Sequence, residues 1–252
     1  MLVYTYSSMI LKTLSLRQFV GNIFLQETII KSDFERFRQR LVQLLNYTDD
    51  ATEAGETEEH NKNFIPPFLQ ETNFGEEYLV NTKGRQDLAI HNGKTRNSSV
   101  GVIIKTKWPC NMGQMISVAS PNRKALQEAI LYYLRERIEQ KNEDITYINA
   151  TDSYRCFIFD ARDFERYFYD SKQLREWYDK CKQDLRVSSR TQFIYKYLST
   201  FINGLDATLK AGYLNLNNYR SLLEKKIDEL DYELYGLTDE EIDIVENSVG
   251  GN

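Results

Sequence analysis

The sequence predicts an α/β fold in which a mixed β-sheet is flanked by helices. The first observation behind this prediction is the order of the elements, which is one helix, three strands, a second helix, two strands and then further helices. Such an order is typical of a sheet covered by helices. The second is the near-continuous apolar run VGVII at residues 100–104, which indicates a central strand covered on both faces. The 252 residues suffice for one good core and a small appendage.

The first predicted helix begins at Ser32-Asp33. One apolar stripe at helical spacing runs along it: Phe34, Phe37, Leu41, Leu44 and Leu45. The acidic stretch at residues 49–59 follows, and we expect it to be a solvated loop. Helical character returns at residues 57–72, where Pro66-Pro67 is expected to interrupt or kink the helix.

Three strands are predicted next, at residues 78–80, 87–91 and 99–107. Asn92-Gly93 lies between the second and third strands. This dipeptide favours a tight turn because both residues tolerate positive φ angles. We therefore expect the second and third strands to form an antiparallel hairpin.

The second half of the chain alternates in the same way. A helix is predicted from Pro121 to about Lys141. Its apolar face consists of four residues: Leu126, Ile130, Leu134 and Ile138. Two strands follow at residues 145–151 and 155–160, and then two aromatic-rich helices at residues 164–184 and 191–202. We expect the aromatic residues to pack in the core.

Charge is distributed unevenly along the chain. The net charge is −5, but residues 49–59 alone carry −6 and residues 224–246 carry −8, so the remainder carries +9. A basic body with acidic appendages fits a surface that faces DNA, because phosphate contacts supply most non-specific affinity. Plain solubility explains the same distribution equally simply.

Composition excludes several classes of protein. The three cysteines lie far apart: Cys110, Cys156 and Cys181. Their spacing predicts reduced thiols and neither a disulfide framework nor a zinc knuckle. With only His60 and His91, a His-rich metal site or a Ser-His-Asp triad is not expected. No apolar run approaches the roughly 20 residues of a membrane helix, and residues 1–9 lack the basic start of a secretory signal, so we expect a cytoplasmic protein with no membrane partner.

One constellation carries chemistry. Asp87 ends the run Gly84-Arg85-Gln86-Asp87 at the start of one hairpin strand, and Lys105 and Lys107 lie near the end of the next. Residues two apart on a strand point to the same face, so the two lysines should project together. A metal-dependent nuclease holds Mg²⁺ with carboxylates at such a place, and a lysine orients or deprotonates the attacking water. Taken alone, the pattern is more often a set of ordinary exposed charges.

The surrounding sequence resembles the nuclease region of type IIG restriction–modification proteins. The resemblance rests on four runs, at residues 81–94, 98–104, 124–137 and 157–165, and it covers residues 11–202. That family belongs to the PD-(D/E)XK nuclease superfamily. The resemblance therefore implies a restriction-endonuclease-like domain at residues 11–203 that acts on double-stranded DNA with Mg²⁺ as cofactor.

Carried over residue by residue, the resemblance makes Asp87 the first metal acid and Lys107 the motif lysine. Glu59 would be an auxiliary metal acid, and Gln127 would be a helix glutamine near the catalytic site. The departure is Lys105, because the family pattern has Glu there, two residues before the lysine. The exchange removes a ligand and puts a cation where Mg²⁺ would bind.

Two consequences of this departure stay open. Lys105 could form a salt bridge with Asp87 that replaces the metal structurally. Alternatively, Glu128 on the following helix could act as a migrated acid.

The C-terminal part resembles the extreme end of the same large proteins, at residues 226–230 and 232–242. No Asn-Pro-Pro-Tyr motif of an amino-methyltransferase occurs, so the chain looks like a relative that lacks the methyltransferase and target-recognition regions. Residues 204–218 are expected to be an irregular linker or deletion junction, and residues 219–247 an acidic helical tail. This tail is a C-terminal helical appendage to the domain.

Three functions follow as alternatives. The chain is a Mg²⁺-dependent restriction endonuclease of type II, impaired by Lys105; or it is an inactive module that binds DNA or a partner; or it is a folded remnant of a restriction–modification system. The missing regions imply a separate methyltransferase or specificity subunit as a partner, and a homodimer is a further expectation.

Overall fold

The computed structural model describes residues 9–20, 30–57, 63–74, 77–83, 87–182, 191–220 and 238. It divides the chain into two compact units, Met1–Leu214 and Asn215–Asn252. In the second unit the described residues are 215–220 and 238, and residues 216–220 are helical.

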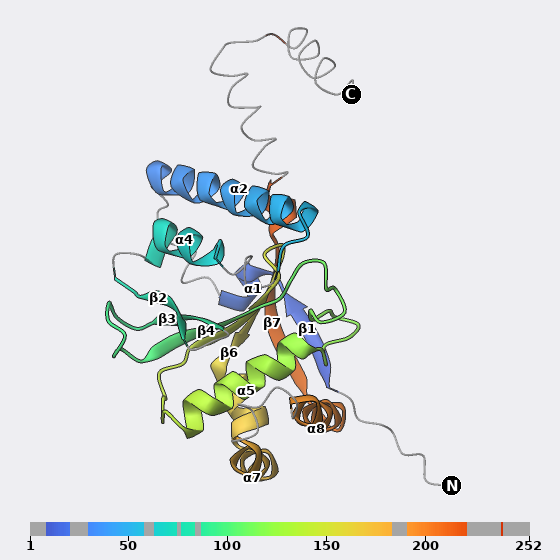
Figure 1. Ribbon diagram of the computed structural model, residues 1–252. Helices are drawn as coiled ribbons and strands as arrows, with labels where there is room; N and C mark the ends of the chain where they lie inside the picture. The colour runs from blue at the N-terminus through green and yellow to red at the C-terminus, as the bar shows by residue number, and fades with distance from the viewer. Residues whose placement is uncertain are drawn as a thin grey trace. The chain divides into compact units, whose positions relative to one another are not determined.

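A seven-stranded sheet forms the centre of the first unit, in the order β1-β7-β6-β5-β4-β3-β2 (Figure 1). Its strands are β1 (Ile10–Leu14), β2 (Val80–Lys83), β3 (Asp87–His91), β4 (Val100–Thr106), β5 (Tyr147–Thr151), β6 (Arg155–Asp160) and β7 (Thr208–Asn215). The β1–β7 and β4–β5 pairs are parallel, whereas β2–β3, β3–β4 and β5–β6 are antiparallel. The predicted mixed sheet is confirmed.

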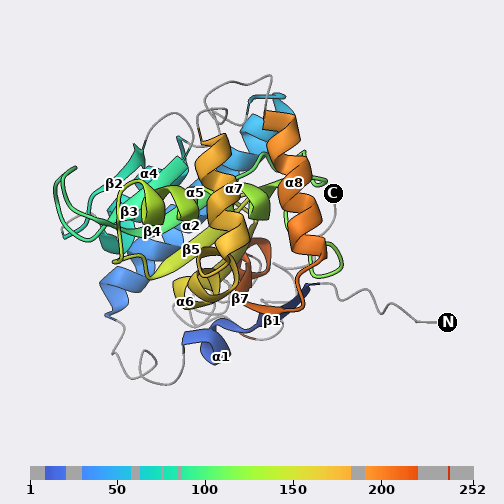
Figure 2. The same ribbon diagram turned by 90° about the horizontal axis from the view of Figure 1, so that it is seen from below.

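Helices cover both faces of this sheet. They are α1 (Leu16–Val20), α2 (Lys31–Glu53), α4 (Ile65–Leu69), α5 (Lys124–Ile138), α6 (Ala161–Phe164), α7 (Lys172–Cys181) and α8 (Thr191–Asn203), with π-helical turns η2 (Gln70–Phe74) and η3 (Glu165–Tyr169). Figure 1 shows α2 and α4 on one side of the sheet and α5 on the other, and Figure 2 looks onto α5, α7 and α8. The α/β class predicted from element order is therefore the observed one.

Two apolar cores lie on the two faces. The core under α5 includes Leu126, Ile130 and Phe159, each 0% exposed, and the core under α2 and α4 includes Leu88 and Ile104. Neighbouring residues on one strand therefore enter different cores, as the period of two requires. Burial on both faces explains why the central strand β4 is an apolar run in sequence.

The predicted hairpin is confirmed, but its turn is longer than two residues. Asn92 and Gly93 continue the ladder, because Leu79 N donates to Gly93 O at 2.9 Å and Asn92 N donates to Ser99 O at 2.8 Å. The chain reverses at the following residues, where Ser98 N donates to Thr95 O at 3.1 Å. The residue before β2, Leu79, also pairs with this segment, so the ladder continues through Asn92 and Gly93 and the chain does not turn there.

Three expectations about element boundaries need correction. The acidic stretch from residue 49 was expected to be a loop, but α2 continues to Glu53, and Tyr154 Oη donates to Asp49 Oδ1 at 2.5 Å. Pro66-Pro67 begins a short helix instead of interrupting one, because a missing N–H does no harm in the first helical turn. The helix expected at residues 164–184 is divided among α6, η3 and α7.

The segment expected to be an irregular linker, residues 204–218, contains β7. This strand pairs in parallel with β1, and its residues Leu209 and Ala211 are each 0% exposed. Neither strand was predicted, because each forms by pairing with a partner almost 200 residues away in the sequence, for which no local pattern gives a signal. Most of the acidic tail, residues 221–237 and 239–247, lies outside the described residues.

Candidate functional site

The β3–β4 hairpin positions the predicted catalytic residues. Leu88 pairs with Ile104 and Ala89 with Ile103. Asp87 directly precedes Leu88 in β3, and Lys105 directly follows Ile104 in β4. The backbone of Asp87 begins β3, but its side chain, like residues 84–86, lies outside what the structure describes.

Lys105 and Lys107 project to the same side of β4, as the strand period predicts. Both side chains are buried, with exposed fractions of 3% and 2%. Their ammonium groups meet one carboxylate oxygen, Oε2 of Glu128, at distances of 2.8 Å and 2.7 Å. Backbone pairing holds the second lysine in place beyond the strand end, because Lys107 N donates to Thr151 O at 2.8 Å.

Helix α5 supplies the carboxylate in its second turn. Glu128 is buried because α5 packs directly on the sheet, and α8 closes over its other oxygen. There Tyr195 Oη donates to Oε1 at 3.1 Å, and Lys124 Nζ lies 3.8 Å away. Lys124 also lies 5.6 Å from the centre of the Tyr195 ring. One carboxylate thus joins β4, α5 and α8.

The electrostatics of this cluster favour the ionised carboxylate. Burial by itself disfavours the charged form, but the positive charges of Lys105 and Lys107 outweigh it, so the pKa of Glu128 is lowered from its ordinary value of 4.5. The Lys105 ammonium also lies 5.6 Å from the centre of the Tyr132 ring, which offers further stabilisation of the cation. The three charges together carry a net +1.

Gln127 does not join this cluster in the described contacts. Its Nε2 donates to Asn122 Oδ1 at 2.8 Å, and Asn122 Nδ2 in turn donates to Ser199 O at 2.8 Å and to Asn203 Oδ1 at 2.7 Å. The amide therefore ties the start of α5 to α8. A role beside the motif lysine stays a prediction. Glu59 lies outside the described residues.

The described residues do not fit a Mg²⁺ site. Within the described ranges, no group of three or more Asp, Glu, His or Cys residues could hold a metal ion. The carboxylate of Glu128 already contacts the ammonium groups of Lys105 and Lys107. Mg²⁺ needs oxygen ligands, and a cation in that position repels it.

The period of the strand predicts that Lys105 and Lys107 project together, but it does not predict that both contact one carboxylate oxygen of Glu128. The sequence offers Glu128 as a migrated acid, whereas the contacts of Tyr195 and Lys124 with its carboxylate are not among the predictions. A signal was present for Lys124 alone, since residues four apart on a helix lie on one face. Tyr195 lies 67 residues from Glu128, and only the packing of α8 on α5 brings the two together.

Residues 14–238 match a family described as Domain of unknown function (DUF7149). The chain belongs to this family. Its DUF7149 region contains all of the residues of the cluster, from β4 to α8. No curated protein and no solved structure matches the chain. Within the described part of this DUF7149 protein, no helix is both long and apolar enough to cross a membrane.

Proposed function

We propose that this chain is a DNA-binding module with a nuclease-like site in which Lys105 takes the place of the metal ion, so that the native chain does not cut DNA. The single observation that carries the proposal is the pair of contacts from Lys105 and Lys107 to Glu128 Oε2, at 2.8 Å and 2.7 Å. The resemblance to type IIG nuclease regions supplies the substrate class, which is double-stranded DNA.

The charges of the cluster support the absence of metal-dependent cleavage. Two unit charges 4 Å apart interact by about 4 kcal/mol at an effective dielectric constant of about 20, so a divalent ion there would face about 8 kcal/mol of repulsion from each ammonium group. By the same estimate, the attraction of the Glu128 carboxylate offsets only one of these two terms. In the proposed site, the ammonium group of Lys105 contacts the Glu128 carboxylate where an active nuclease would hold its metal ion.

The basic body of the chain supports DNA binding. Outside its two acidic segments the chain carries +9, and such a surface gains affinity by releasing the counterions of DNA. The resemblance to type IIG proteins does not extend to the region that reads bases in them, so we expect binding by these residues to depend little on DNA sequence. A separate specificity subunit or methyltransferase would be the natural partner of such a module.

The test is plasmid nicking in Mg²⁺ or Mn²⁺ by the wild type, Lys105→Glu, and Lys105→Glu combined with Asp87→Ala. We expect the wild type to be silent, the single variant to nick and the double variant to be silent, because Glu at position 105 restores the family's acid beside Lys107. Lys94→Glu, in the exposed loop of the same hairpin, reverses an equal charge away from the cluster and should stay silent.

Two results would contradict the proposal. Cleavage by the wild type that Glu128→Gln abolishes would make Glu128 the second metal acid and the chain an active endonuclease. Absence of cleavage in every variant, together with no binding of duplex DNA, would leave a folded remnant as the better account.

A further inference from the structure

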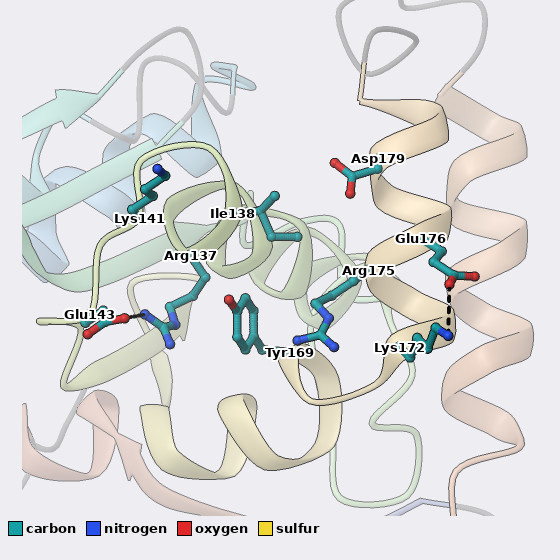
Figure 3. Close-up of a pocket in the computed structure, with 9 residues that line it drawn as sticks. All are labelled: Arg137, Ile138, Lys141, Glu143, Tyr169, Lys172, Arg175, Glu176 and Asp179. Atoms are coloured by element: carbon teal, nitrogen blue, oxygen red, sulfur yellow. Dashed lines mark ion pairs between the residues drawn. The ribbon is translucent and has the colours of Figure 1, made fainter.

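A second polar site lies on the far side of α5, at its C-terminal end. It is a pocket of about 530 Å³ between the end of α5, the loop that follows it, η3 and α7. Figure 3 shows Tyr169 at its centre, with Arg137 on one side and Arg175 on the other. The volume is in the range of small-ligand pockets, which is about 300–1,000 Å³.

Arg137 forms a rigid wall of this pocket. Its Nε and Nη2 donate to the two oxygens of Glu165 at 2.8 Å and 2.6 Å, and its Nη1 donates to Asn142 O at 3.0 Å. Tyr133 Oη donates to the same carboxylate at 2.5 Å. Glu165 therefore neutralises Arg137 and fixes its plane, which lies 4.6 Å from the centre of the Tyr169 ring.

Arg175 differs from Arg137 in its relation to Glu165, because its charge acts on that carboxylate without a hydrogen bond or ion pair between these two described residues. Its guanidinium lies 5.2 Å from the centre of the Tyr169 ring, and within the described ranges it forms no ion pair. Lys141, just beyond the end of α5, likewise forms none with any described residue. Its φ of 52° is the left-handed conformation in which the chain leaves the helix.

The acids that line the pocket form their ion pairs with other cations among the described residues. Glu176 pairs with Lys172 at 3.8 Å, and Asp179 pairs with Lys182 at 2.9 Å. Glu143 is 83% exposed and lies 3.7 Å from Arg137. Among the described residues, the guanidinium of Arg175 thus faces the pocket without an ion-pair partner, and the Tyr169 ring and Ile138 form other walls.

We propose that this pocket binds a small phosphorylated ligand, with Arg175 as the main contact to phosphate. A guanidinium matches phosphate with two parallel hydrogen bonds, and its position over Tyr169 orients it before the ligand arrives. The volume left beside the phosphate, bounded by Ile138 and Tyr169, accommodates a compact organic group. The proposal is independent of the cluster at Glu128.

The test is isothermal titration of the full chain with inorganic pyrophosphate at constant ionic strength. We expect saturable binding with a dissociation constant on the order of 1 mM or tighter, weakened about tenfold or more by Arg175→Gln and less by Arg175→Lys. The matched control is Arg166→Gln, which removes an exposed guanidinium of η3 that contacts Tyr167 and does not line the pocket. Its affinity should equal that of the wild type.

The outcomes separate this site from the proposed DNA-binding function. No saturable binding of pyrophosphate by the wild type, or equal loss in Arg175→Gln and Arg166→Gln, overturns the proposal. A loss of affinity for a duplex of about 20 base pairs in Arg175→Gln, without loss for pyrophosphate, overturns it in favour of a contact to the DNA backbone. Thermal melting of each variant verifies that the fold is intact.

Discussion

Glu128 contacts two buried ammonium groups with a single carboxylate oxygen, at 2.8 Å and 2.7 Å. Such a cluster is sensitive to which member is removed. Loss of the carboxylate removes the oxygen that both buried ammonium groups contact, whereas loss of Lys105 keeps the contact between Glu128 and Lys107. The two substitutions should therefore have very different effects on stability.

The expected result is a loss of about 3–5 kcal/mol of unfolding free energy for Glu128→Gln, because two buried ammonium groups lose the carboxylate that both contact. Lys105→Met keeps a long side chain in the same space and should cost less than about 1.5 kcal/mol. Urea denaturation at neutral pH measures both. Equal losses in the two variants would contradict the assignment of Glu128 as the shared counter-charge.

The contribution of Glu128 should also depend on pH. Its pKa in the folded chain is lowered from the ordinary value of 4.5 because of Lys105 and Lys107, despite burial. A lowered carboxyl pKa contributes stability that is fully present above the unfolded value and is lost as pH falls through the folded value. The difference in stability between wild type and Glu128→Gln should be constant from neutral pH to about 5 and shrink below about 4.5. A difference that grows on acidification would refute this sign.

At the scale of elements, β7 makes the part of the chain after residue 203 necessary for the sheet. Leu209 is 0% exposed on β7, and the strand separates β1 from β6. A chain that ends at residue 203 would lose the strand and expose both neighbours. This replaces the expectation that the domain ends at residue 203, whereas the expectation that the acidic tail is dispensable stays a prediction.

Leu209→Ala should destabilise the chain by about 2–5 kcal/mol, as other large-to-small changes in cores do. The adjacent Lys210→Ala is the matched control, because its side chain is exposed, and its effect should stay within about 0.5 kcal/mol. Thermal and urea unfolding measure both variants. Truncation after residue 203 should lower the melting temperature far more than truncation after residue 220. Equal melting temperatures would mean that β7 contributes nothing to the core.

At the scale of the whole molecule, the distribution of charge predicts how the chain meets DNA. The body that carries +9 should bind duplex DNA weakly, and affinity should fall steeply between about 50 and 200 mM salt through counterion release. Fluorescence anisotropy with two unrelated duplexes measures this, and the two should give the same affinity within a few-fold. Strong preference for one duplex, or binding insensitive to salt, would contradict the prediction.

The sequence by itself determined the elements whose pattern is local. β3 and β6 begin and end at the predicted residues, 87–91 and 155–160, and α5 has the predicted apolar face. The common direction of Lys105 and Lys107 is equally local, because it depends only on the period of a strand. These features need no knowledge of what packs against them.

Only the tertiary structure decided what those lysines contact. Glu128 reaches them because α5 crosses the sheet at β4, and Tyr195 reaches Glu128 because α8 packs on α5. The β1–β7 pair joins residues from opposite ends of the first unit in the same way. Contacts between distant residues depend on how whole elements pack, and no local pattern of side chains encodes that packing. The physical reason is that burial and backbone pairing, which stabilise these contacts, arise only once the sheet and its helices have assembled.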